Sequence, residues 1–218
     1  MGAWNRAKTG KIMKLRSPLT ITLSLAILAA TSLPIIAQAV RFPTDAELQQ
    51  LIEKFRRFAA SPPGGGRGLY STDRRDRIQI QQLTSFVKAW SQIDPATAPF
   101  LGKWTAWEET KSIYPSNLKG RVCIIDGFIP SENNIGFRFG IGTVSNGRIK
   151  TDNYLLIHEK NYLGGIFVYN NEPGIYEYAW PKPLTNPSQL MRNVPLAKRN
   201  QLLQQFKEAE CTASLPKK

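Results

Sequence analysis

The fold is decided by residues 135–150, which read IGFRFGIGTVSNGRIK. Large apolar side chains alternate with Gly or Arg from Ile135 to Ile141, and a period of two is typical of a β-strand with two different faces. The run then reaches Asn146-Gly147, a pair whose positive φ values suit a tight type I′ turn. Residues 148–150 begin a returning strand. This stretch therefore predicts a β-hairpin.

Further short alternating segments lie on both sides of this hairpin. They occupy residues 103–113, 121–129, 153–159, 165–169 and 175–180, and turns rich in Pro, Gly and Asn separate most of them. No helical pattern fits between them, which argues against the crossovers that parallel strands need. We therefore predict an α+β fold: an antiparallel meander of six to eight strands, or a small barrel, flanked by N- and C-terminal helices.

The start of the chain has the parts of an export signal. Five basic residues and no acid precede an uncharged stretch that begins at Ser17 and is dominated by Leu, Ile and Ala. The stretch closes on Ala37-Gln38-Ala39, so residues 1–39 are predicted to be a signal peptide cleaved after Ala39. Cleavage would place the protein in a periplasm, a lumen or the extracellular space. The alternative is an uncleaved N-terminal membrane anchor, because the stretch is long enough to span a bilayer.

The sequence divides the remaining chain into three parts. Residues 40–60 form a predicted helix that opens on the capping box Thr44-Asp45-Ala46-Glu47 and carries apolar residues at helical spacing. Residues 61–69, which include Pro-Pro-Gly-Gly-Gly, are predicted to be a flexible linker. Residues 70–218 hold the sheet, with a helix over about 76–93 before it and another over about 195–210 after it.

Cys123 and Cys211 are the only cysteines. In an exported protein an even number favours a disulfide, which would join the sheet to the C-terminal helix. Such a long closed loop predicts a stabilisation of about 4 kcal/mol in the chain-entropy model. The alternative is two separately buried thiols. No metal or other cofactor is predicted, because two distant cysteines and one histidine provide too few metal ligands.

The segment Gly102-Lys103-Trp104 resembles the G-x-W that opens the first strand of lipocalins and their calycin relatives. In that family the Trp closes one end of an up-and-down barrel. The match covers three residues. The resemblance implies a calycin-like barrel with a habit of binding small apolar molecules in its interior.

Arg138 lies on a strand face whose other residues are glycines. The face opposite the large apolar residues carries Gly136, Gly140 and Gly142 together with Arg138. The glycines predict either strong bending of the strand or room for a ligand against the backbone. Arg138 is expected either to form an ion pair with Glu108 or Asp126 on a neighbouring strand or to meet an anionic ligand group.

A set of aromatic side chains with polar atoms completes the candidate binding residues. Such residues suit a binding surface or the rim of a cavity, although they equally suit a strand packed under a helix. The set consists of Trp107, Tyr154, Tyr176, Tyr178 and Trp180.

Enzyme activity is the less favoured reading, and no catalytic residue is assigned. The chain has no P-loop, no Rossmann glycine pattern and no G-x-S-x-G. The adjacent carboxylates Glu108 and Glu109 point to opposite faces of a strand and cannot flank one bond. The only histidine, His158, is expected at a strand end on the surface.

Three functions remain open. The leading hypothesis is an exported, non-enzymatic protein that binds a small apolar or amphipathic ligand in or on the sheet. The alternative is an accessory protein of an envelope or internal membrane complex that docks on an anionic membrane or an acidic protein. This alternative is motivated by the basic net charge, which falls from +13 to +8 when the five basic residues of the signal are removed but stays clearly positive. A hydrolase is the third. Export argues against nucleic acid as a partner.

Overall fold

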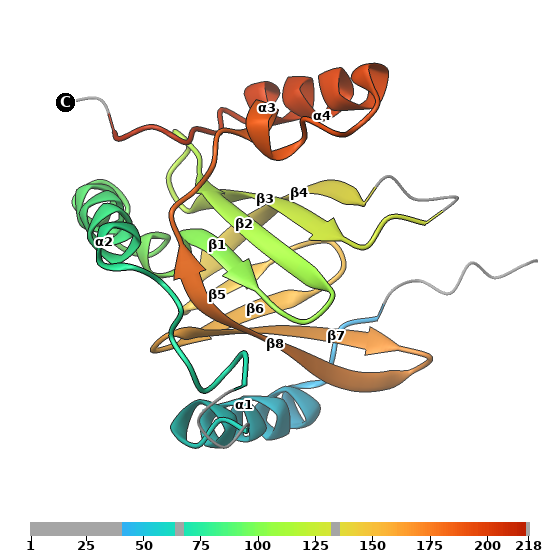
Figure 1. The fold of residues 1–218 in the computed structure, drawn as a ribbon. Helices are drawn as coiled ribbons and strands as arrows, with labels where there is room; N and C mark the ends of the chain where they lie inside the picture. The colour runs from blue at the N-terminus through green and yellow to red at the C-terminus, as the bar shows by residue number, and fades with distance from the viewer. Residues whose placement is uncertain (1–40, 64–67, 132–135, 217–218) are drawn as a thin grey trace, which may run out of the picture. The chain divides into compact units, whose positions relative to one another are not determined.

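The structure, a computed structural model, describes residues 41–63, 68–131 and 136–216, so the predicted signal peptide lies outside the described residues. The described residues belong to one compact unit, Ala39–Lys218. Each strand pairs antiparallel with the next, and the first pairs with the last, which closes a barrel (Figure 1). The strands are β1 (Gly102–Thr105), β2 (Glu109–Pro115), β3 (Arg121–Phe128), β4 (Phe137–Ser145), β5 (Arg148–Lys150), β6 (Leu155–Glu159), β7 (Tyr162–Tyr169) and β8 (Glu172–Lys182). The predicted antiparallel barrel flanked by helices is confirmed.

The hairpin that decided the fold forms as predicted. Ser145 faces Arg148 across a two-residue turn, and both Asn146 (φ 50°) and Gly147 (φ 68°) take the positive φ values of a type I′ turn. The prediction of one strand over residues 103–113 was wrong. The chain turns between β1 and β2, where the Ala106 N–H donates to the carbonyl of Glu109. This turn contains no Gly, Pro or Asn, so nothing in its composition interrupts the alternating pattern.

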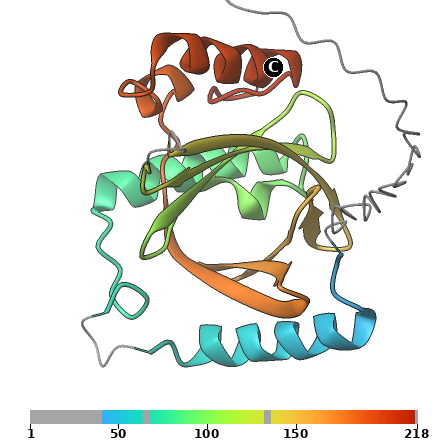
Figure 2. The same ribbon diagram turned by 90° about the vertical axis from the view of Figure 1, so that its right-hand side faces the viewer.

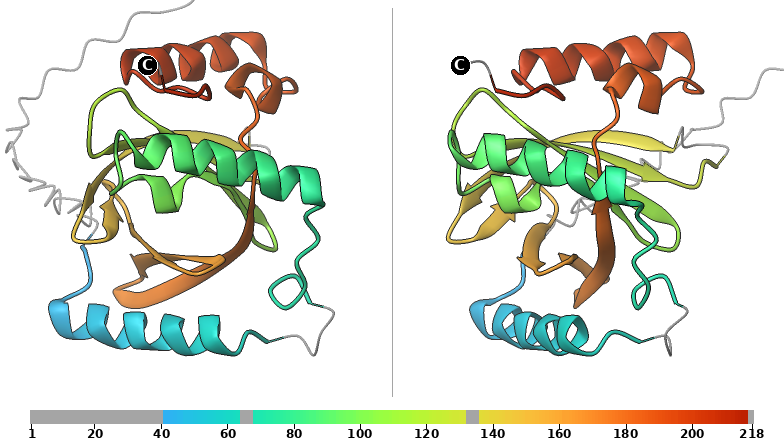
Figure 3. Two further views of the ribbon diagram at one scale, coloured as in Figure 1. Left: turned by 90° about the vertical axis from the view of Figure 1, so that its left-hand side faces the viewer. Right: turned by 60° about the vertical axis from the view of Figure 1, so that its left-hand side comes forward.

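Helices cover the barrel on two sides and at one end (Figures 1, 2 and 3). Helix α1 (Asp45–Ala60) packs on the outside of β6, β7 and β8, and α4 (Leu196–Glu208) packs on the side formed by β2, β3 and β4. Helix α2 (Arg77–Ser91), the 3-10 turn η1 (Ala98–Phe100) and the short helix α3 (Pro187–Leu190) complete the set. Among the described helices, none is both long enough and apolar enough to cross a bilayer.

Local signals in the sequence fix where two of these helices begin. The predicted capping box of α1 is present, with Glu47 donating its backbone N–H to the Thr44 hydroxyl and Thr44 donating its own to the Glu47 carboxylate. Asp76 and Gln79 form the same reciprocal pair at the start of α2. Both helices then place an apolar stripe against the barrel, which is where most of their stability arises.

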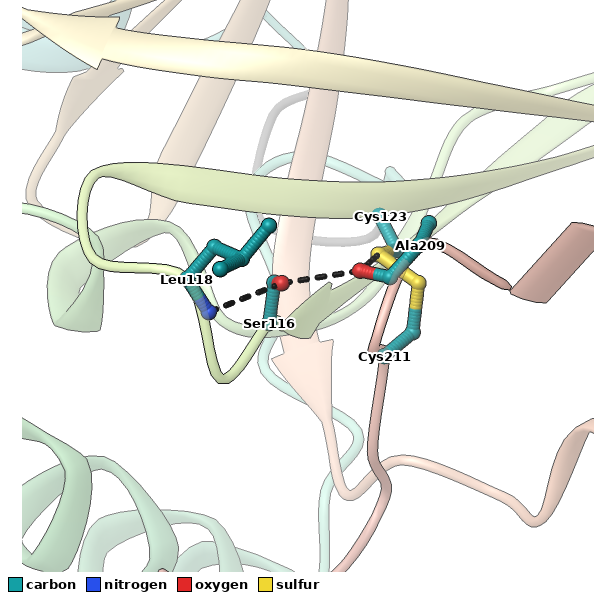
Figure 4. Close-up of a disulfide and its surroundings, with 5 residues drawn as sticks. All are labelled: Ser116, Leu118, Cys123, Ala209 and Cys211. Atoms are coloured by element: carbon teal, nitrogen blue, oxygen red, sulfur yellow. Dashed lines mark hydrogen bonds between the residues drawn. A yellow bond between two sulfur atoms is a disulfide. The ribbon is translucent and has the colours of Figure 1, made fainter. Parts of the chain in front are cut away.

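A disulfide between Cys123 and Cys211 ties β3 to the segment after α4, as predicted (Figure 4). The two Cα atoms lie 6.0 Å apart. Beside it, the Ser116 hydroxyl donates to the carbonyl of Ala209 at 2.9 Å and accepts from the Leu118 N–H at 3.1 Å. The bond and these contacts hold the end of α4 against the outside of the barrel.

The end of the barrel under α2 and η1 is filled with apolar side chains. Trp104, Ile113 and Leu163 point inward there and have no exposed surface. The indole N–H of Trp104 donates to the carbonyl of Phe100 at 2.8 Å, which fastens η1 across this end. Trp104 therefore packs at this closed end of the barrel, and this half holds a buried apolar core.

Two residues on the glycine-rich face of β4, Gly140 and Gly142, play different roles. The strand register places this face of β4 toward the interior, where Gly140 pairs with Ile124 and Gly142 pairs with Val122. A Cβ at Gly142 would lie 2.3 Å from Cγ2 of Ile149, so the absence of a side chain lets β5 pack closely. A Cβ at Gly140 would meet no atom within 4 Å. Open space beside the backbone, one of the two expectations for these glycines, is thus found at Gly140, whereas Gly142 permits close packing, which was not predicted.

We predict that Gly142→Ala lowers the free energy of unfolding by about 1–3 kcal/mol, because it overpacks the contact with Ile149. The matched variant Gly140→Ala adds the same methyl group to open space and is expected to change stability by less than about 1 kcal/mol. Urea unfolding of both variants measures the difference. Equal losses at the two positions would contradict this packing.

Candidate functional site

The end of the barrel opposite α2 is not covered by any of the described helices (Figure 1). The turns between β1 and β2 and between β7 and β8 meet there. A cavity of about 370 Å³ opens between them. We call it the barrel mouth and define it by the six residues that line it: Glu108, Glu109, Phe128, Ile129, Phe167 and Tyr176.

Strand register brings the residues of the barrel mouth together. Glu109 is the first residue of β2 and lies opposite Phe128, the last residue of β3. Phe167 on β7 faces Gly174 on β8, where a Cβ would lie 3.2 Å from Cζ of the Phe167 ring. The missing side chain at Gly174 therefore lets the ring lie flat across the neighbouring strand. Tyr176 follows two residues later on the same inward face.

A layer of hydrogen-bonded polar side chains crosses the interior below the barrel mouth. The Lys111 ammonium donates to Asp126 at 2.7 Å, and these two side chains are only 6% and 9% exposed. The Tyr154 hydroxyl donates to the other oxygen of Asp126 at 3.2 Å. Lys111 Nζ also lies 4.2 Å from the centre of the Tyr154 ring. Because a buried charge is costly without partners, this pair needs each of these contacts.

Glu109 links the barrel mouth to the polar layer. The Tyr178 hydroxyl donates to the Glu109 carboxylate, and Lys111 Nζ lies 5.3 Å from the centre of the Tyr178 ring. Burial raises the pKa of Tyr178, and the charge of Glu109 raises it further. Burial and the neighbouring Asp126 raise the pKa of Tyr154 in the same way. Both phenols therefore remain protonated donors to the two carboxylates at neutral pH.

The polar layer is satisfied by its own members. Among the described residues, no buried side-chain nitrogen or oxygen lacks a hydrogen-bond partner. A ligand at the barrel mouth therefore meets a floor whose buried groups are already paired. The groups that remain open to it are those of the rim: Glu108, which is exposed, and Arg138, whose guanidinium lies 5.6 Å from the centre of the Phe128 ring.

The structure places four of the six predicted binding residues on the inward face near this site. Tyr176 lines the barrel mouth, Tyr154 and Tyr178 belong to the polar layer, and Arg138 lies at the rim. The expected ion pair of Arg138 with Asp126 does not form, although the two residues face each other in register, because Asp126 bonds Lys111. A ligand-binding role for all of them stays a prediction.

The other two predicted residues lie elsewhere. Trp107 is in the turn between β1 and β2, with 74% of its surface exposed. It lines an adjoining open groove of about 480 Å³ that shares Glu108, Glu109, Phe128 and Ile129 with the barrel mouth. Trp180 faces outward, where its ring lies 5.6 Å from that of Tyr162 and its indole N–H donates to the carbonyl of Leu69 at 3.1 Å. Trp180 therefore packs beneath α1, which was the alternative to binding.

Sequence reasoning missed Lys111, named Asp126 only as a possible partner of Arg138, and missed Phe128 and Phe167. A signal was available for Asp126, because this charged residue directly follows the apolar run Val122–Ile125; Lys111 lies between Thr110 and Ser112 and gives no such signal. Charged residues are rarely buried unless they are paired, so a carboxylate in such a strand indicates a buried partner. The pairing of Lys111 with Asp126 itself depends on the register of β2 against β3.

His158 lies in the other half of the barrel. It is half-buried, with its ring 5.9 Å from Phe100 and 5.6 Å from Trp104, so its expected place on the surface was wrong. Burial lowers its pKa. The cavity beside it holds about 150 Å³, below the range of about 300–1,000 Å³ typical of small-molecule sites. The barrel mouth is within that range.

Comparisons with protein-family models, with curated proteins and with solved structures found no match. Among the described residues, no group of three or more His, Cys, Asp or Glu side chains is arranged to hold a metal ion. The case for a function therefore depends on the geometry of the barrel mouth and the layer beneath it.

We predict that Lys111→Met lowers the free energy of unfolding by about 3–5 kcal/mol, because it leaves Asp126 buried without its cation. In the double variant Lys111→Met/Asp126→Asn, the amide keeps an oxygen for the Tyr154 hydroxyl and removes the unpaired charge. It should recover more than half of that loss in urea unfolding. If the double variant lost as much free energy of unfolding as the two single variants lose together, the two charges would not be coupled.

Proposed function

We propose that the protein binds a small amphipathic molecule at the barrel mouth and does not transform it chemically. One observation carries the proposal: a cavity of small-molecule size whose wall is aromatic and whose floor is a paired polar layer. Phe128, Phe167 and Ile129 offer apolar surface to the body of such a molecule. Glu108 and the hydroxyl of Tyr176 lie where its polar group would enter.

The filled half of the barrel restricts where the ligand lies. The apolar side chains under α2 leave no exposed surface on Trp104, Ile113 or Leu163. Below the barrel mouth, the Lys111–Asp126 pair separates that core from the opening. A ligand deep in the interior, as the calycin resemblance implies, would have to displace both. The barrel mouth offers room without such displacement.

The disulfide supports the proposal that the protein works outside the cytoplasm, because such bonds persist in oxidising compartments. Docking by a basic surface is less well supported. Exposed basic residues occur on α1, such as Lys54 and Arg57, and on α4, such as Lys207, and these helices lie on opposite sides of the barrel (Figure 1). Two separate basic faces do not define one docking surface.

Fluorescence titration with N-phenyl-1-naphthylamine, a neutral apolar probe, tests the proposed function. We expect saturable binding to the wild-type protein and about tenfold weaker binding to Phe167→Ala, which removes one wall of the cavity. Tyr169→Ala is the matched control, since this nearby ring is 70% exposed and does not line the cavity. Absence of saturable binding, or equal affinity for the wild type and a correctly folded Phe167→Ala, would refute the proposal.

A further inference from the structure

We infer that the molecule bound at the barrel mouth is a cation: an amine or a quaternary ammonium group that carries an apolar substituent. The inference builds on the proposed function and names the class of ligand. It rests on the carboxylates, the aromatic rings and the position of Arg138 around the cavity.

The barrel mouth is acidic, in contrast to the chain as a whole. Two of its six lining residues are glutamates, and none is basic. Burial raises the pKa of the Tyr176 hydroxyl, a hydrogen bond with the backbone of Glu108 lowers it, and the charges of Glu109, Glu108 and Glu177 raise it. The chain carries a net charge of +8 once the predicted signal is removed. The residues that line this opening are therefore acidic in a chain that is basic overall, and they attract a positive group.

The aromatic rings suit the same kind of ligand. Phe128, Phe167 and Tyr176 line the cavity together with the glutamates. Faces of aromatic rings attract cations, and cages of such rings bind quaternary ammonium groups. A cation of this chain already makes that contact at the rim, since the Arg138 guanidinium lies 5.6 Å from the centre of the Phe128 ring. A ligand ammonium would make the equivalent contact from inside the cavity.

An anionic ligand finds no available partner in the floor. Lys111 is the nearest buried cation, but it is 6% exposed and already bonded to Asp126. Arg138 is the one cation at the rim that the described residues place beside these rings, and it is exposed. Arg138 therefore has opposite effects on the binding of cationic and anionic ligands. It would compete with a cationic ligand and would assist an anionic one.

Isothermal titration calorimetry with three probes of equal chain length, each below its micellar concentration, tests the inference: octyltrimethylammonium, 1-octanol and octanoate. We expect octyltrimethylammonium to bind about tenfold more tightly than 1-octanol, and octanoate to bind more weakly than either. Glu108→Gln, in an exposed side chain, should weaken octyltrimethylammonium binding three- to tenfold and change 1-octanol binding much less, because the amide keeps the polar atoms but removes the charge. Arg138→Gln should strengthen octyltrimethylammonium.

Glu53→Gln is the matched control, because it makes the same change of charge at an exposed position on α1 and should alter none of the affinities. Equal binding of 1-octanol and octyltrimethylammonium, with no effect of Glu108→Gln, would overturn the inference and leave the proposed function standing. Preference for octanoate, lost in Arg138→Gln, would replace it with an anionic ligand. If none of the three probes binds, the proposed function falls together with the inference.

Discussion

An eight-stranded barrel encloses an interior that is just wide enough to be filled by side chains or to hold one small ligand. This chain divides that space by chemistry along the barrel axis. At the end under α2, Trp104 and its apolar neighbours form a buried core. Across the middle, the buried pair Lys111–Asp126 replaces hydrophobic contact with charge. At the far end, beyond the pair, the described residues leave a cavity of about 370 Å³.

The buried ion pair explains why the opening has the shape and charge that it has. Lys111 needs a carboxylate and finds Asp126, which also accepts from Tyr154, while the aromatic ring of Tyr154 faces the ammonium group. Glu109, one residue pair nearer the rim, accepts from Tyr178 instead. Each polar group of the layer is thus held in place by another, and a fixed layer gives the cavity above it a rigid floor. Such a pair need not add net stability, because the cost of removing both charges from water offsets their attraction.

Features set by neighbouring residues could be predicted from the sequence. The Asn146-Gly147 turn and the capping box at Thr44 follow from local backbone chemistry, and the pairing of Cys123 with Cys211 follows from there being only two cysteines. The candidate site could be predicted only in part, because alternation along a strand reveals two faces without showing which one is enclosed. In β4 the large apolar residues Phe137 and Phe139 face outward, where α4 covers them. The glycine-rich face lies inside. Partners such as Lys111 and Asp126 meet only when the register of two strands is known.

The central claim is that a ligand lies at the barrel mouth, above the polar layer, while the apolar half of the barrel stays closed. Intermolecular nuclear Overhauser effects between octyltrimethylammonium and the isotope-labelled protein test it most directly. The account predicts contacts from the alkyl chain to the rings of Phe128, Phe167 and Tyr176, with none to Trp104. Contacts to Trp104 and Leu163, with loss of the Lys111–Asp126 contact, would show that the ligand enters the core and would contradict the account.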